Sequence, residues 1–172
     1  MFTLGNYDEE TLTIVGLFEK KKFNISLNQT SGGTISIIAP NTNVYYYGDN
    51  VVIQANAETG YDLTGFKLTI GETPYDFSAG SAGVVVDLEN GTLTISNITD
   101  HIVCEAIFTI QKFTLNVVLS HANGAEVYNG DNNASLIGTH EFDYNTVLSL
   151  VIRLSEGYQI VSIVDDLNNE FG

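Results

Sequence analysis

The chain has 172 residues, of which 44% are hydrophobic and only 16% are charged, so it can bury a core and is not a disordered segment. Six Lys and Arg against 21 Asp and Glu give a formal net charge of −15, which disfavours binding to nucleic acid and to anionic membrane surfaces. The single cysteine, Cys104, excludes an intrachain disulfide, and no stretch approaches the ~18 apolar residues that a membrane span needs.

The N-terminal ten residues have neither the basic region nor the apolar region of a signal peptide. If Met1 is the natural start, we expect no export by the ordinary secretory route. Residues 1–21 are predicted to form an N-terminal segment with one strand near residues 12–18. That strand resembles the closing strand of a β module.

Almost every later segment has the pattern of strand and turn. Strands are predicted at residues 23–27, 51–55, 84–88, 92–96, 102–108 and 147–152, which alternate in polarity or are rich in β-branched residues. Asn90-Gly91 between two of them is the strongest hairpin signal. No window shows a capped amphipathic helix, so the chain is predicted to be all-β, with at most a short helix near residues 132–137.

The second half of the chain repeats the first with a period of roughly 90 residues. Residues 23–27 correspond to 113–117, and Gly60-Tyr61 corresponds to Gly157-Tyr158. We therefore predict one module at residues 22–110 and a second at 111–172. The second module is either incomplete here or completed by another strand, since it has no counterpart of residues 84–108. Truncation of a longer protein and strand donation from residues 12–18 both explain this pattern.

The order of these motifs resembles the divergent internalin-type B-repeat family, also called the Listeria–Bacteroides repeat. The resemblance is carried by Lys22-Phe23-Asn24-Ile25-Ser26-Leu27, Ser31-Gly32-Gly33-Thr34-Ile35, the run from Tyr47-Gly48 to Ala57, Gly60-Tyr61, Leu93-Thr94-Ile95 and Ala106-Ile107-Phe108. It implies small immunoglobulin-like β-sandwich or β-grasp-like modules, which serve as adhesive or spacer elements in bacterial surface proteins and phage structural proteins. Phe66 stands where the family has Trp, and Ile163 holds that place in the second unit.

Six residues of the first unit are predicted to form the core of the repeat. Gly60-Tyr61 starts a strand, and its ring is expected to pack beside that of Phe66. The predicted core residues are Phe23, Val52, Tyr61, Phe66, Ile95 and Phe108.

The sequence contains few residue patterns that are typical of catalytic or metal sites. His101, His121 and His140 have no metal-ligand spacing, and Cys104 in its apolar run is expected to be a buried hydrophobe. The oxygen-rich segments at residues 131–133 and 165–170 lack EF-hand spacing, so polar loops are expected there rather than calcium sites. We predict no enzyme activity, no cofactor and no metal.

The run Tyr45-Tyr46-Tyr47 is the one aromatic cluster that invites a binding role, because tyrosines bury large areas at interfaces. In a strand, Tyr45 and Tyr47 would share one face and Tyr46 would take the other. We predict an interface there, with a glycan contact as one form of it.

These observations favour a non-enzymatic virion structural protein of a bacteriophage, as a capsid decoration, head fibre or tail-associated protein. Its partners would be other virion or surface proteins and further copies of itself, and its location the virion surface. The alternatives are a segment of a bacterial cell-surface adhesin or stalk, and a carbohydrate-binding accessory module that stacks sugars on residues 45–47.

Overall fold

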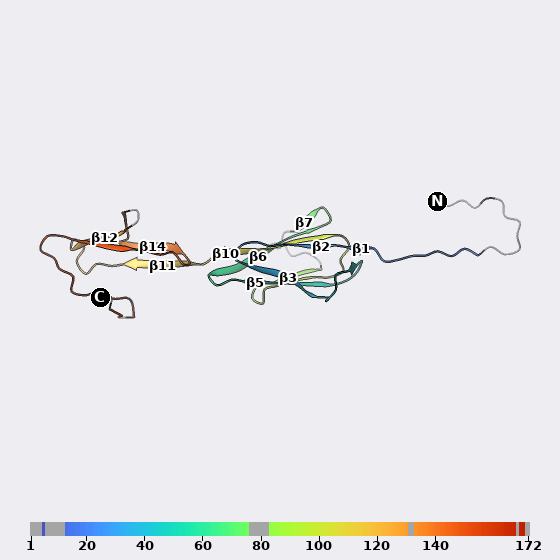
Figure 1. Ribbon diagram of the computed structural model, residues 1–172, viewed down its shortest axis with the longest axis horizontal. Helices are drawn as coiled ribbons and strands as arrows, with labels where there is room; N and C mark the ends of the chain where they lie inside the picture. Colours follow the sequence, from blue (N-terminus) through green and yellow to red (C-terminus); the bar gives the residue numbers. More distant parts are fainter. Residues whose placement is uncertain (1–4, 6–12, 76–82, 131–132, 168, 171–172) are drawn as a thin grey trace.

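The computed structural model describes residues 5, 13–75, 83–130, 133–167 and 169–170, and every regular element in these residues is a β-strand. Figure 1 shows two β modules in series along the long axis, with an N-terminal tail that leaves the first module at the end away from the second. Within these ranges there is no helix that could cross a membrane. The predicted all-β fold is confirmed.

The first module holds two four-stranded sheets and one short two-stranded pairing. One sheet has the order β2-β10-β6-β7, the other has the order β3-β5-β9-β8, and β1 pairs with β4. Strand β10 lies inside its sheet, because it pairs in parallel with β2 and antiparallel with β6. The strands are β1 (Lys22–Phe23), β2 (Ile25–Asn28), β3 (Gly33–Ala39), β4 (Tyr45–Tyr46), β5 (Val51–Ala57), β6 (Tyr61–Ile70), β7 (Thr73–Tyr75), β8 (Val84–Asp87), β9 (Thr92–Ile95) and β10 (Ile102–Ile110).

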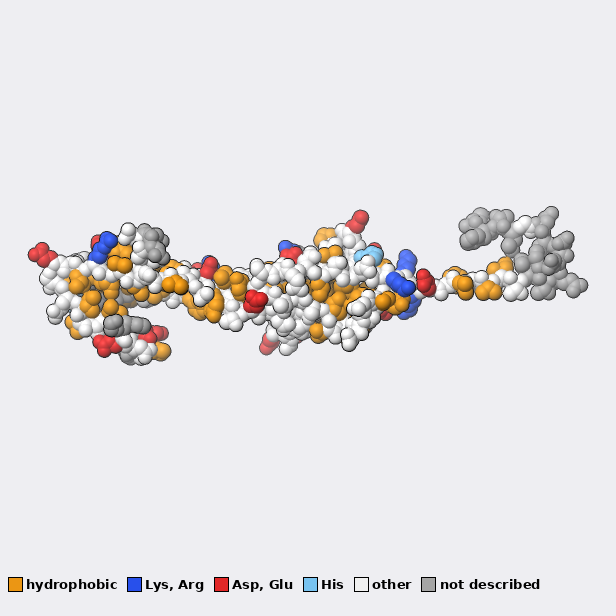
Figure 2. Space-filling view, viewed as in Figure 1, with side chains coloured by type: hydrophobic (Ala, Val, Ile, Leu, Met, Phe, Trp, Pro, Cys, Tyr) orange, Lys and Arg blue, Asp and Glu red, His pale blue; other side chains and the backbone are white. Residues whose placement is uncertain are grey.

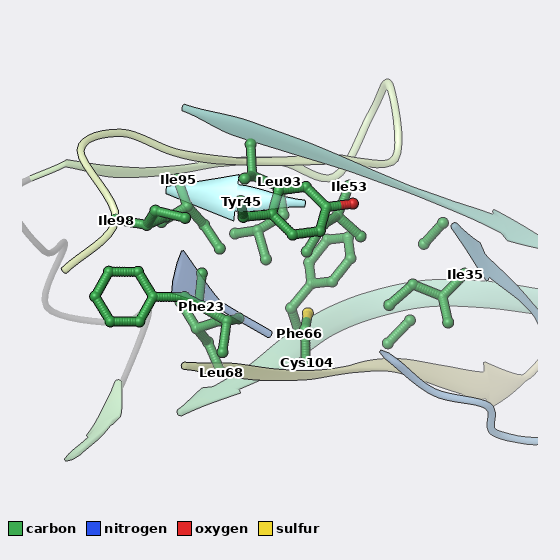
Figure 3. Close-up of a cluster of buried hydrophobic side chains, with 14 residues drawn as sticks. Phe23, Ile35, Tyr45, Ile53, Phe66, Leu68, Leu93, Ile95, Ile98 and Cys104 are labelled. Carbon is green, nitrogen blue, oxygen red and sulfur yellow. The ribbon is translucent and has the colours of Figure 1, made fainter. Parts of the chain in front are cut away.

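Side chains from both sheets meet in one apolar core, which makes the first module a β-sandwich. In β5, Val51 and Ile53 are completely buried. Across from them, Phe66 of β6 and Cys104 of β10 fill the core, as Figure 3 shows. A β-grasp arrangement would place a helix against one sheet, and no helix occurs in the part of the chain that the structure describes.

A β-bulge in β6 keeps its inward side chains in phase with the core. Gly65 lies opposite Ile107, and Leu63 lies opposite the next residue of β10, so Thr64 is an extra residue on this strand. Without it, Leu63 and Phe66 would point to opposite faces, because side chains alternate along a strand. With it, both contact the core.

The second module has a two-stranded sheet, β11-β14, and a three-stranded sheet, β13-β12-β15. The helix predicted near residues 132–137 is wrong: residues 131 and 132 lie outside the described residues, and Ala134–Ser135 pair with β12 instead. The strand predicted at residues 147–152 begins only at Leu150. The strands are β11 (Lys112–Val117), β12 (Ala125–Asn129), β13 (Ala134–Ser135), β14 (Gly138–Asp143) and β15 (Leu150–Leu154).

The predicted strand at residues 23–27 is divided at Asn24 into β1 and β2. The amide of Asn24 donates to Nδ1 of His101 at 2.9 Å, and its carbonyl accepts from the amide of Ile102 at 2.9 Å. These bonds move the chain from its pairing with β4 to its pairing with β10.

Backbone geometry repeats between the modules. The amide of Glu58 donates to the carbonyl of Gly32 at 2.9 Å, and Ser155 donates to Gly124 in the second module at 3.1 Å. The strand pairing that follows this hydrogen bond also repeats. The first residue of β3 lies opposite the last residue of β5, and the first residue of β12 lies opposite the last residue of β15. The internal repeat seen in the sequence is therefore a repeat of structure.

The N-terminal tail forms no strand within the described residues. Residue 12 of the strand predicted at residues 12–18 lies outside them, and residues 13–18 have no strand pairing. Four large apolar side chains of this tail are exposed, namely Ile14, Val15, Leu17 and Phe18.

Candidate interaction site

The tyrosine cluster does not form a continuous platform. Tyr45 is only 6% exposed and lies in the core with Phe23, its cross-strand partner (Figure 3). Tyr46 is half-buried, and Tyr47 is 50% exposed. The prediction that Tyr45 and Tyr47 share a face is wrong, because β4 ends at Tyr46, where the amide of Asp49 donates to its carbonyl and turns the chain.

Three of the predicted core residues are buried: Phe23, Phe66 and Ile95. Phe108 is partly buried and packs against the same cluster.

Two predicted core residues need correction. Val52 is only half-buried, because it lies between Val51 and Ile53 and so faces away from the core. Tyr61 is also half-buried, and its ring covers Gly32 at the end of the sandwich rather than packing beside Phe66. The apolar pattern of β5 did not show which of its two faces is inward.

The two modules meet at a junction built around Gln111, the single residue between β10 and β11. Its amide donates to the carbonyl of Gly60 at 2.8 Å, and its carbonyl accepts from the amide of Tyr144 at 2.7 Å. Its side-chain amide donates to Oδ1 of Asp62 at 2.7 Å. Hydrogen bonds on both sides of this residue fix how the second module follows the first.

The ring of Tyr144 lies directly against Gly60 at this junction. A Cβ atom at Gly60 would collide with that ring, and the φ angle of 86° is one that favours glycine. Sequence reasoning identified Gly60-Tyr61 as a repeat motif, but it missed the contact with Tyr144. No local pattern marks a contact between residues 84 positions apart.

The free end of the first module has the counterparts of Tyr144 and Gln111, but no counterpart of Gly60 lies against them in the described residues. The amide of Tyr47 donates to the carbonyl of Lys21 at 3.0 Å, just as Tyr144 donates to Gln111. In the repeat, Tyr47 corresponds to Tyr144 and Lys21 corresponds to Gln111. None of the described glycines lies against the ring of Tyr47, which is 50% exposed.

The counterpart of Gly60, which is the other half of the junction, lies in the second module. Gly157 corresponds to Gly60 and has a φ of 84°, close to the 86° of Gly60. Apart from its chain neighbours, no described residue has an atom within 4 Å of where the Cβ of Gly157 would be, whereas Gly60 is covered by Tyr144. Among the described residues, the chain thus shows one occupied junction and two complementary unoccupied halves.

The second module leaves apolar side chains exposed at positions that the first module buries. Ile53 is 0% exposed and its counterpart Leu150 is 54% exposed, while Phe66 is 3% and its counterpart Ile163 is 39% exposed. Figure 2 shows apolar side chains spread over the visible face of this module. Contiguous exposed apolar patches are typical of interaction surfaces.

Cys104 and His101 lie in structural environments of the first module. Burial raises the pKa of the Cys104 thiol to about 12, so the thiol is neutral at physiological pH. His101 packs edge-on against Phe23 with ring centroids 5.6 Å apart. Within the described residues, no three His, Cys, Asp or Glu side chains are grouped to hold a metal ion.

Asp165, the first residue of one predicted polar loop, closes a local turn. Its Oδ1 accepts from the amides of Leu167 and Asn169, and its Oδ2 accepts from the side chain of Asn169 at 2.6 Å. These hydrogen bonds, with the side chain of Asn169 foremost, lower the pKa of the carboxyl group. Residues 131, 132 and 168 of the two predicted polar loops lie outside the described residues.

Together these features define a protein of tandem all-β repeat modules. Residues 23–99 match the family model of the divergent InlB B-repeat domain, the family that the sequence motifs resemble. The family is found in bacterial surface proteins. No curated protein matched the chain, and no solved structure did.

Proposed function

We propose that this protein is a non-enzymatic structural and attachment component of an external surface, and that it acts through β modules arranged in series. The observation that carries the proposal is the junction at Gln111, where Gly60 and Tyr144 join two modules along one axis. Such a junction sets the direction of the chain from one module to the next. It suits a spacer or fibre element that holds contact surfaces at a defined distance.

The partners that we propose are proteins, including further copies of this chain. The net charge of −15 opposes contact with nucleic acid and anionic lipid. The exposed apolar residues of the second module favour a protein partner, since a protein surface can cover them.

The location that we propose is the virion of a bacteriophage, where the protein would decorate the capsid or form part of a head fibre or tail. The alternative is the bacterial cell surface, which the occurrence of the repeat family favours. In both locations the modules would act passively, through folded surfaces and not through chemistry.

Mass spectrometry distinguishes the two locations. Peptides of the chain would be quantified in purified phage particles and in material released by protease from intact cells. Stoichiometric recovery from particles supports the virion proposal, and recovery from cell surfaces alone supports the adhesin alternative. Recovery only from the cell interior would contradict both.

A further inference from the structure

Among the residues that the structure describes, no strand of the second module occupies the position that β10 holds in the first module. In the first module, β10 lies between β2 and β6. The counterpart of β2 is β11, which in the described residues pairs with β14 and, through Val117, bridges to Ile137 just before β14. The counterpart of β6 begins at Tyr158, and residues 158–163 have no strand pairing there. A strand in the position of β10 would pair with both.

The N-terminal tail has the sequence pattern of that strand. Phe18 stands five residues before Phe23, as Phe108 stands five residues before Phe113. With this alignment, Ile14 falls at the place of the buried Cys104. The remaining inward positions also match in type: Gly16 corresponds to Ala106, and Phe18 to Phe108.

The tail of a chain cannot reach the second module of the same chain. Only residues 19–21 separate Phe18 from β1, and they extend about 13 Å at most to Lys22. Strand β1 lies at the Ile102 end of β10, while the second module follows the Ile110 end, roughly 26 Å away. Figure 1 shows the tail and the second module at opposite ends of the first.

We infer that residues 13–18 of one copy add as the missing strand to the second module of another copy. The register of β10 against β2 predicts the new pairing. Ile14 would lie opposite Val117 of β11, and Val15 would lie opposite Val118. Ile14, Gly16 and Phe18 would face inward and cover the apolar side chains that the second module leaves exposed.

The same contact would complete the two unoccupied halves of the junction. Tyr47 of the incoming copy would lie on Gly157, as Tyr144 lies on Gly60 within the chain. The amide of Lys21 would donate to the carbonyl of Gly157, as Gln111 donates to Gly60. One contact between copies thus accounts for an exposed tyrosine, an uncovered glycine and an unpaired strand edge.

Charge favours the contact. Lys20, Lys21 and Lys22 are three of the six basic residues of the chain, and Figure 2 shows basic side chains where the tail leaves the first module. The second module carries the exposed acidic residues Glu156, which is adjacent to Gly157, and Asp166. Opposite charge on two joining surfaces orients and accelerates association.

The resulting contact joins different surfaces of two identical chains, so it propagates in one direction. Such heterologous contacts produce open filaments unless the rotation closes a ring. Because the copy-to-copy junction would repeat the internal junction, the modules would follow one another with the same geometry along the fibre. The inference deepens the proposed structural function by naming the partner, and its biological meaning rests on that function.

Neighbouring tail residues provide a matched test in the full-length chain. Ile14 is 70% exposed and Val15 is 74% exposed in the single chain, so a glutamate at either site leaves both modules folded. In the added strand, Ile14 would face inward, whereas Val15 would take the outward place of Glu105. Sedimentation velocity over a concentration series would compare the wild-type chain with Ile14→Glu and Val15→Glu.

We expect the wild-type chain and Val15→Glu to form concentration-dependent oligomers. Ile14→Glu should lower the association constant more than about 100-fold, because it would bury an unpaired carboxylate. A wild-type chain that remains monomeric at every concentration would overturn the inference and assign the unfilled position to another segment or protein. Equal loss in both variants would overturn the strand register.

Disulfide trapping tests the same register directly. A mixture of Val15→Cys and Val118→Cys chains should form a cross-linked dimer rapidly, while Thr13→Cys mixed with Val118→Cys should react slowly because Thr13 is displaced by two residues. Cys104 is fully buried and does not compete. Equal rates in the two mixtures, or no cross-link, would contradict the pairing.

The two proposals can fail separately. If the wild-type chain does not self-associate in vitro, the proposed surface role still stands, since single chains can coat a particle. Absence from particles and cell surfaces would remove the surface role and leave strand addition standing.

Discussion

Tyr144 of the second module packs its ring on Gly60 of the first, and the backbone of Gln111 bonds to both residues. The contact exists only because Gly60 has no side chain. It turns a one-residue link between β10 and β11 into a defined junction. The modules of this chain are therefore held in series by a tyrosine-on-glycine contact and by backbone hydrogen bonds.

The first prediction compares two glycines with the same backbone conformation. Gly60→Ala adds a methyl group that collides with Tyr144 and also strains a positive φ angle, whereas Gly157→Ala only strains the angle. The strain of placing an alanine at this φ angle costs about 1 to 2 kcal/mol of unfolding free energy. We expect Gly60→Ala to reduce the free energy of unfolding in urea by clearly more than Gly157→Ala, at concentrations where the chain is monomeric. Equal losses would show that the Tyr144 ring moves aside without cost.

The second prediction compares equivalent positions of the two modules. Phe66→Ala should cost about 3 to 5 kcal/mol of unfolding free energy, because it empties part of a packed core. Ile163→Ala should cost less than about 1 kcal/mol in the monomer, because its side chain is already 39% exposed. Chemical denaturation followed by tyrosine fluorescence measures both. A large loss for Ile163→Ala would indicate that the second module is better packed than its exposure implies.

The sequence predicted the class of fold because its signals are local. Asn90-Gly91 turns β8 into β9 at the predicted hairpin. Residues that report on neighbours along the chain were therefore placed well.

The errors fall where distant contacts decide the structure. His101 divides the first predicted strand at Asn24, and β12 draws Ala134 into a strand where a short helix was expected. Val52 was predicted to lie in the core and does not, because residues 51–53 are all apolar and their polarity does not show which face of the strand is inward. The junction contact of Tyr144 and the two unoccupied halves of that junction also required the three-dimensional structure.

The third prediction concerns pH. Burial raises the pKa of Cys104 to about 12, well above its value in the unfolded chain. The folded state therefore holds this proton at a pH where the unfolded state has released it, and stability falls as pH rises from about 8.5 toward 12. Below the unfolded pKa the contribution is constant. We expect Cys104→Ala to lose less stability than the wild-type chain over this range, after its own cavity cost at neutral pH is subtracted.

Urea denaturation of both proteins at pH 7, 9 and 10 measures this difference. The variant is needed because Tyr and Lys side chains titrate in the same range and affect both proteins alike. Parallel curves would contradict the prediction. The same burial predicts that a thiol reagent modifies Cys104 only after unfolding.

The last prediction separates the tyrosines of the cluster. Tyr45→Ala should destabilise the first module by about 3 to 5 kcal/mol, since its ring fills the core beside Phe23. Tyr47→Ala should change the melting temperature of the monomer little, because half of its side chain is in solvent. If Tyr47 contacts a second copy, its loss should instead weaken self-association.

Thermal unfolding at low concentration and sedimentation at high concentration measure the two effects separately. A glycan array with the same proteins tests the carbohydrate alternative, which predicts binding that Tyr47→Ala abolishes without any change in self-association. A tyrosine that serves only the fold would change the melting temperature and neither binding measurement. The three roles of this aromatic run therefore produce three different patterns of results.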